Sequence, residues 1–181
     1  GLIDTQSALN ASFAADMPAP GNIAFFSQSG ALCTSILDWA ANECIGFSKF
    51  ISMGNKTDID EVALIKAIEN DASTKIVLVY LEGVKNGTEF INAAKEITKK
   101  KPMIVVKSGG TTAGAKAASS HTGTLAGSEN AFDAAFKQSG ILRAKTIEEL
   151  FDYARIFSFQ QLPRGPHIAL ITNAGGPGII A

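Results

Sequence analysis

Short apolar runs alternate with longer segments of helical periodicity from residue 22 onward. The short runs are rich in β-branched and aromatic residues, a composition that favours strands. Most are apolar almost throughout, as in strands buried on both faces of a parallel sheet. The predicted strands cover residues 23–27, 49–53, 76–81 and 103–107, with a weaker one at 141–143.

Helices are predicted between these strands. They cover residues 31–42, 60–70, 88–100, 128–138 and 146–157, with Ser128 and Thr146 as N-caps. In the third helix, apolar residues at i, i+3, i+4 and i+7 indicate one buried face, and Pro102 ends the segment. The alternation predicts an α/β fold: a flavodoxin-like, doubly wound parallel sheet with helices on both faces.

The alternating pattern assigns one domain to residues 21–160, and the two flanks differ from it. Residues 1–20 lack strong periodicity and are expected to be the tail of a preceding domain with a linker. A second linker is expected at 161–166. Residues 167–181 then predict a strand at 167–172 and a glycine-rich turn at 173–178, the start of another α/β domain.

Composition narrows the class of protein. The chain has 181 residues, 46% of them hydrophobic, so it can bury a core. Its 16 basic and 17 acidic residues nearly balance, and no basic run carries interleaved aromatics, so nucleic acid is not an expected partner. Unpaired Cys33 and Cys44, with no signal or membrane-spanning segment, indicate a cytoplasmic protein without a membrane partner.

The first candidate site follows the first predicted strand. Residues 27–31 (SQSGA) are small and polar, and they open the first helix. Backbone N–H groups of Ser29, Gly30 and Ala31 could bind a phosphate there, with help from the helix dipole. The alternative is an ordinary tight turn in which Ser29 caps the helix.

Two residues could perform acid–base or nucleophilic chemistry. His121 lies in a long loop rich in Gly, Ala, Ser and Thr, and a neutral imidazole is a good nucleophile. Glu82 follows an apolar strand and could orient an imidazole through a hydrogen bond. The alternatives are a surface histidine and a solvated carboxylate.

Two further loops are weaker candidates for anion binding. Residues 53–58 contain Lys56, which could meet a phosphate, although a plain turn is the favoured interpretation. The turn at 173–178 has a strand–turn–helix pattern that would suit a second anion site.

Two of these motifs together resemble the succinyl-CoA synthetase superfamily, and most closely its ADP-forming acetyl-CoA or acyl-CoA synthetase branch. Residues 21–32 (GNIAFFSQSGAL) resemble the phosphate-binding strand and turn of that family, and residues 120–123 (SHTG) resemble its phosphohistidine loop. By this resemblance His121 and Glu82 would be catalytic, with no metal ligand in the chain. Phosphate-binding residues would be Ser29, Gly30, Ala31, Gly123, Asn173, Gly175 and Gly176.

The resemblance also implies a reaction and partners. Acyl-CoA, ADP and phosphate would be converted to free acid, CoA and ATP through an acyl phosphate and a phosphohistidine. Residues 1–20 would end a CoA-binding domain, and an ATP-grasp domain or subunit would handle ATP or ADP with Mg. The isolated chain would be an inactive part of an acid–thiol ligase and would bind none of these tightly, and the complete enzyme is expected to be an oligomer.

Two other classes of function remain open from the sequence. The chain could be a synthetase-like regulatory or CoA-binding region of a protein acetyltransferase, or a flavodoxin that binds FMN. The acyl substrate and the choice between ADP and GDP are not determined by these residues.

Overall fold

A single mixed sheet organises the chain. The computed structural model describes residues 1–109 and 129–180, and in these the strand order is β2-β1-β4-β3-β5-β6-β7. Five neighbouring strands from β4 to β7 are parallel, and β1 and β2 are antiparallel additions at one edge. The bounds are β1 Leu2–Asp4, β2 Leu9–Ala11, β3 Pro20–Ser27, β4 Phe47–Ser52, β5 Ile76–Leu81, β6 Met103–Lys107 and β7 Leu142–Ala144.

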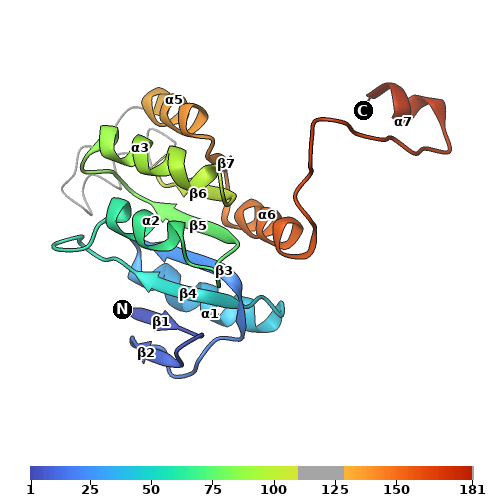
Figure 1. The fold of residues 1–181 in the computed structure, drawn as a ribbon. Coiled ribbons are helices and arrows are strands. Elements are labelled where there is room, and N and C mark those ends of the chain that lie inside the picture. Colours follow the sequence, from blue (N-terminus) through green and yellow to red (C-terminus); the bar gives the residue numbers. More distant parts are fainter. Residues whose placement is uncertain (110–128, 181) are drawn as a thin grey trace.

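Helices cover both faces of the sheet (Figure 1). Helices α1 (Gly30–Asn42) and α6 (Ile147–Phe159) pack on one face, and α2 (Glu61–Glu69), α3 (Gly87–Thr98) and α5 (Glu129–Ser139) pack on the other. Alternation along β3 shows why both faces must be covered: Phe25 contributes to the first core and Phe26 to the second. Both rings are fully buried.

Aromatic side chains fill the core beneath α1 and α6. The ring centroids of Phe25 and Phe50 are 4.9 Å apart in a stacked arrangement, and those of Trp39 and Phe151 are 4.4 Å apart. Burying one such side chain stabilises the fold by roughly 1.5–3 kcal/mol. These contacts fix α1 and α6 against the sheet and so fix the helix that begins at the candidate phosphate site.

The fold class predicted from the sequence is confirmed. In chain order the parallel strands are arranged 2-1-3-4-5, which is the flavodoxin-like order. Strands β5 and β6 have the predicted bounds, and the other strands and helices predicted between residues 22 and 160 begin or end within a few residues of the observed ones. Thr146 is an N-cap as expected, with its side chain accepting from the Glu149 N–H at 3.1 Å, whereas Ser128 lies outside the described residues.

The hairpin β1–β2 was not predicted. It joins the main sheet because β1 pairs with β4, with Leu2 opposite Ile51. The sequence did not reveal the hairpin because three-residue strands are too short to show an alternation of apolar and polar residues. Ile3 is the one buried side chain in the two strands. Whether residues 1–20 also end a CoA-binding domain stays a prediction.

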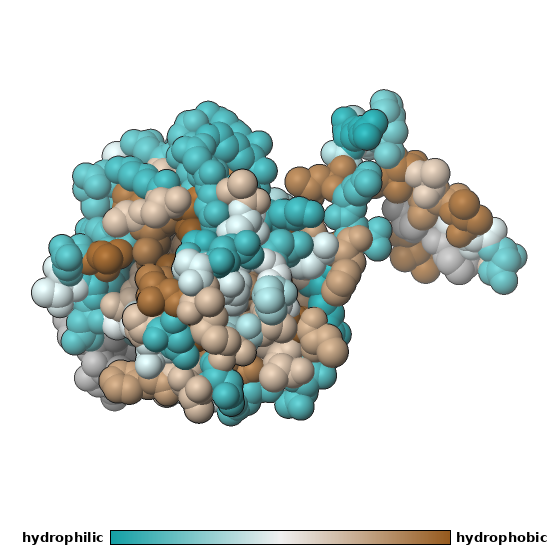
Figure 2. Space-filling view, turned by 60° about the horizontal axis from the view of Figure 1, so that its bottom comes forward, coloured by the Kyte–Doolittle hydropathy of each residue, from teal (hydrophilic) through white to brown (hydrophobic). Residues whose placement is uncertain are grey.

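The strand predicted at 167–172 is wrong. These residues are exposed and have no strand partner in the described structure, and a strand requires a ladder of hydrogen bonds to another segment. Most of the turn predicted at 173–178 belongs instead to the short helix α7 (Gly175–Ile180). Figure 1 shows this part projecting from the body, and Figure 2 shows apolar side chains on its surface. The exposed apolar residues there are Ile168, Leu170, Ile171, Ile179 and Ile180.

Candidate active site

The candidate site lies at the carboxyl edge of the sheet between β3 and β5. Strand β3 has β4 on one side and β5 on the other, so the chain order reverses at this point. Ligands of open α/β sheets bind in the crevice that such a reversal opens. Ser29, Gly30 and Ala31 form the turn after β3 and the start of α1, and Glu82 directly follows β5. The structure therefore brings these four predicted residues to one place.

Ser29 is the N-cap of α1. Its side chain accepts a hydrogen bond from the Leu32 N–H at 3.3 Å. The buried Ser27 hydroxyl accepts from the Ser29 N–H at 3.0 Å and donates to the Ser29 carbonyl at 2.8 Å, which fixes the turn. Exposed Gly30 and Ala31 follow, and as the first two helical residues their N–H groups have no carbonyl partner within the helix. The turn combines a capped helix with two available donors.

Glu82 is half-buried at the end of β5, and its backbone is held by the side chain of Gln28. The Gln28 amide oxygen accepts from the Glu82 N–H at 2.7 Å and from the Gly83 N–H at 3.0 Å. The amide nitrogen of the same side chain donates to the Gly83 carbonyl at 2.9 Å. This role of Gln28 was not predicted from the sequence, although Gln28 lies within the predicted turn.

Lys56 contacts protein groups, which favours the plain-turn interpretation over a phosphate ligand. Its ammonium group donates to the Gly83 carbonyl at 2.8 Å and lies 3.2 Å from the carboxylate of Glu61. Gly54 and Lys56 both have a positive φ, which turns the loop after β4 back towards β5. The loops after β3, β4 and β5 are thereby joined at one carbonyl group.

Lys107 is a buried cation at the same edge that the sequence analysis missed. It is the last residue of β6, pairs in register with Leu81, and its ammonium lies 4.8 Å from the centroid of the Phe132 ring. Burial lowers its pKa, an effect that the charge of Glu129 opposes. A lysine at the carboxyl end of an otherwise apolar strand was the signal available in the sequence.

The structure places three of the predicted residues elsewhere and does not describe two others. His121 and Gly123 lie outside the described residues, so their positions relative to Glu82 are not described. Asn173, Gly175 and Gly176 are exposed in the part that projects beyond α6 (Figure 1). Their predicted binding of phosphate stays a prediction.

The described part of the chain offers neither a metal-binding cluster nor a membrane-spanning helix. Residues 1–109 and 129–180 contain no group of three or more His, Cys, Asp or Glu side chains that could hold a metal ion. Among the helices formed by these residues, none has the length and apolar character needed to cross a membrane.

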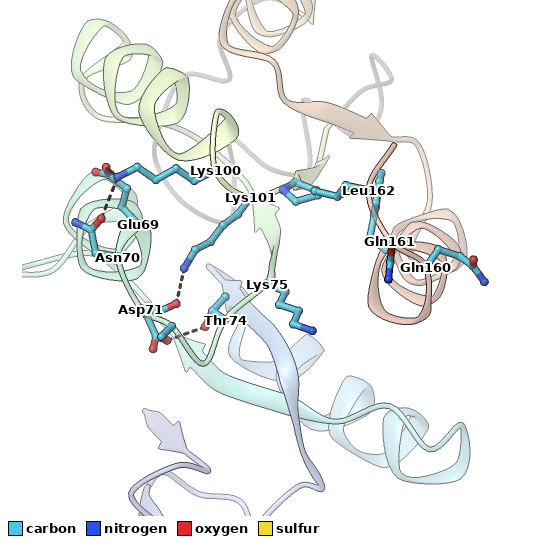
Figure 3. Close-up of a pocket in the computed structure, with 13 residues that line it drawn as sticks. Glu69, Asn70, Asp71, Thr74, Lys75, Lys100, Lys101, Gln160, Gln161 and Leu162 are labelled. Atoms are coloured by element: carbon cyan, nitrogen blue, oxygen red, sulfur yellow. Dashed lines mark hydrogen bonds and ion pairs between the residues drawn. The ribbon is translucent and has the colours of Figure 1, made fainter. Parts of the chain in front are cut away.

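A cavity of about 530 Å³ lies at the opposite, amino-terminal edge of the sheet (Figure 3). The ammonium of Lys101 donates to the Ile68 carbonyl at 2.8 Å and to that of Asp71, and Lys100 pairs with Glu69. These groups are engaged with each other and hold the loop between α2 and β5. These lining residues therefore have a structural role, and the cavity is not a candidate ligand site.

The fold and this site define the class of the protein. A family model described as succinyl-CoA ligase-like flavodoxin domain matches residues 20–157, which is most of the chain. The chain belongs to this family.

Particular relatives narrow the class. The chain is 49% identical, over its whole length, to the alpha subunit of ADP-forming acetate–CoA ligase I from Pyrococcus furiosus, and it spans 39% of that subunit. Over 99% of its length it is 46% identical to the ADP-forming 4-hydroxybutyrate–CoA ligase of Nitrosopumilus maritimus, and it spans 26% of that enzyme.

A solved structure agrees with these relatives. It is the dinucleotide-forming acetyl-coenzyme A synthetase 1 of Ca. Korarchaeum cryptofilum, in complex with phosphate and ADP. The TM-score is 0.91 at 42% identity, and the match covers 99% of this chain and 39% of that one. The chain thus spans about two fifths or less of these three proteins.

Proposed function

We propose that the chain is part of an ADP-forming acyl-CoA synthetase, an acid–thiol ligase. The complete enzyme converts acyl-CoA, ADP and phosphate to free acid, CoA and ATP. The reaction proceeds through an acyl phosphate, whose phosphoryl group passes to His121 and then to ADP. The names of the relatives support this assignment over a regulatory region of an acetyltransferase, and the chain by itself is inactive in overall turnover.

One observation carries the proposal: a capped helix with two available N–H donors lies beside a fixed glutamate at the switch point of the sheet. Ser29, Gly30 and Ala31 hold the phosphoryl group at the start of α1, where backbone donors and the helix dipole stabilise its charge. Glu82 orients the imidazole of His121 and stabilises its positive charge during transfer. Gly123 contributes a further N–H donor beside the histidine.

Other domains complete the enzyme in this proposal. Residues 1–20 end a CoA-binding domain, 161–166 form a linker and 167–181 begin a second ligase domain. The exposed apolar side chains of Ile168, Leu170 and Ile171 support such a domain, because they gain a core there. Asn173, Gly175 and Gly176 then bring a second set of donors to the phosphoryl group.

The partners of the complete enzyme follow from the reaction. An ATP-grasp domain or subunit binds ATP or ADP with Mg, and the complete enzyme is an oligomer. The acid is short, as in the named acetate and 4-hydroxybutyrate ligases. The two free thiols support a cytoplasmic location.

Labelling of the complete protein tests this function. Incubation with γ-labelled ATP and Mg should give an acid-labile, alkali-stable phosphoprotein, and His121→Ala should abolish it. The control is His167→Ala, which removes the exposed second histidine and should leave the label unchanged. Label that persists in His121→Ala would reject the assignment of this histidine, and turnover that survives intact would favour a regulatory role.

A further inference from the structure

One side chain from the turn after β3, that of Gln28, binds the backbone of both Glu82 and Gly83. Gln28 makes three hydrogen bonds to it, at 2.7, 3.0 and 2.9 Å. The Gln28 N–H also donates to the Tyr80 carbonyl at 3.2 Å, which continues the pairing of β3 with β5 by one residue. Main chain and side chain of Gln28 therefore set the direction in which the chain leaves β5.

A second group of side chains holds the same loop from the side of β4. The Gly83 carbonyl accepts from Lys56 as well as from Gln28, and Lys56 is paired with Glu61. Glu61 is 1% exposed and accepts from the Lys85 N–H at 3.3 Å. Side chains from the loops after β3 and β4 and from the start of α2 thus hold the segment that begins at Glu82.

The Glu82 carboxylate itself is not used by this network. Within residues 1–109 and 129–180, no hydrogen bond or ion pair joins it to another group. The N–H groups of Glu82 and Gly83 are both held by Gln28, while the Glu82 carboxylate is left able to bind another group. A half-buried carboxylate without a protein partner among the described residues remains able to accept a hydrogen bond from a further group.

We infer that Gln28 is a positioning residue for Glu82. By holding the Glu82–Gly83 backbone, the Gln28 amide sets the position and direction of the Glu82 carboxylate beside the N-terminus of α1. The inference rests on the proposed function, in which Glu82 orients the phosphorylated histidine. A primary amide suits the role because it accepts from two N–H groups and donates to a carbonyl through one planar group. A carboxylate lacks the donor, and an ammonium lacks the acceptor.

Gln28→Met in the complete enzyme tests the inference, because Met has similar length and makes none of the three bonds. Single-turnover phosphorylation by labelled ATP should slow by about 10- to 100-fold, the range typical of a catalytic group displaced by about 1 Å. The KM for ATP should change little, since the proposed function places the nucleotide on an ATP-grasp domain or subunit outside this loop. Gln28→Asn, which keeps the amide but shortens its reach, serves if the Met variant does not fold.

Thr98→Val is the matched control. The Thr98 hydroxyl donates to the Ser139 carbonyl at 2.7 Å and joins α3 to the end of α5, away from the carboxyl edge. The variant should lower the melting temperature to a similar or greater extent than Gln28→Met. Its phosphorylation rate should stay at the wild-type value.

A double-mutant cycle separates positioning from a merely structural role. In a Glu82→Gln background, Gln28→Met should slow phosphorylation no further, because the group that it positions is already gone. The same slowing in both backgrounds, or no slowing in the wild-type background, would overturn the inference. A phosphoprotein that survives His121→Ala would overturn the proposed function instead, whatever the Gln28 variants do.

Discussion

The ammonium group of Lys56 lies 3.2 Å from the carboxylate of Glu61, and this ion pair is almost fully shielded from water. The side chains are 13% and 1% exposed, respectively. A buried pair gains little over apolar packing because both charges lose their hydration, but removing one partner leaves the other charge uncompensated. The pair therefore adds little net stability to the fold, but the loop after β4 cannot move Lys56 away from Glu61 without a large cost in free energy.

Lys56→Met should lower the free energy of unfolding by about 3–5 kcal/mol, because Glu61 is left buried without a counter-charge. Adding Glu61→Gln to the same protein should recover much of this loss. Lys99→Met is the control, since Lys99 and Glu96 form an exposed pair, and it should cost less than about 1 kcal/mol. Urea unfolding curves measure all three, and equal small effects of both lysine variants would contradict the prediction.

Gly21 and Gly30 should differ sharply in their tolerance of alanine. A Cβ at Gly21 would lie 2.2 Å from the Gly46 backbone, whereas at Gly30 the nearest atom is the Ser52 hydroxyl oxygen at 3.8 Å. Gly21→Ala should therefore destabilise the protein by about 1–3 kcal/mol or more through overpacking. Gly30→Ala should be neutral or stabilising by up to about 1 kcal/mol, because alanine loses less backbone entropy in a helix. Thermal melts of the two variants compare them directly, and equal melting temperatures would refute this.

The regular part of the fold could be predicted because its signals are local. The strand from Met103 to Lys107 is apolar and short, and the helix after Thr146 has a cap and a period. Parallel strands between helices then fix the edge at which Ser29 and Glu82 must lie. Strand β1 escaped prediction because its pairing with β4 joins segments far apart in the chain.

The interactions within the site could not be predicted in the same way. Gln28 reaches Glu82 because the register places Ser27 opposite Tyr80, and register is a property of the folded sheet. Lys56 could have met a phosphate or a carbonyl, and only the positive φ of its loop turns it to Gly83. The strand predicted at 167–172 was wrong because its apolar pattern needs a partner strand that no other described segment provides.

Acid should weaken the loop between α2 and β5 through Asp71. Burial raises the pKa of this carboxyl group, but hydrogen bonds from Thr74 and Ser73 outweigh that effect and lower the pKa from 3.8 to about 2. Since the folded-state pKa is depressed, the stabilisation is complete above about pH 4 and is lost as the pH falls towards 2. The contribution is about 1–2 kcal/mol.

Asp71→Asn isolates this contribution. The wild type should exceed the variant in free energy of unfolding by about 1–2 kcal/mol at pH 6, and most of this difference should be lost by pH 2. Other acidic groups, such as Asp4, titrate in both proteins and largely cancel in the difference. Denaturant unfolding at pH values from 2 to 6 provides the measurement, and a gap that does not change with pH would contradict the assignment.

The two thiols should react at very different rates. Burial raises the pKa of Cys33, which packs in the core beneath α1, whereas Cys44 is exposed just after that helix with a φ of 55°. Because the thiolate is the reactive form and needs access, iodoacetamide should label Cys44 at least about tenfold faster in the native protein. In denaturant this difference should disappear. Peptide mass spectrometry over a time course measures both rates. Equal native rates would mean that the Cys33 face of α1 is not packed against the sheet in solution.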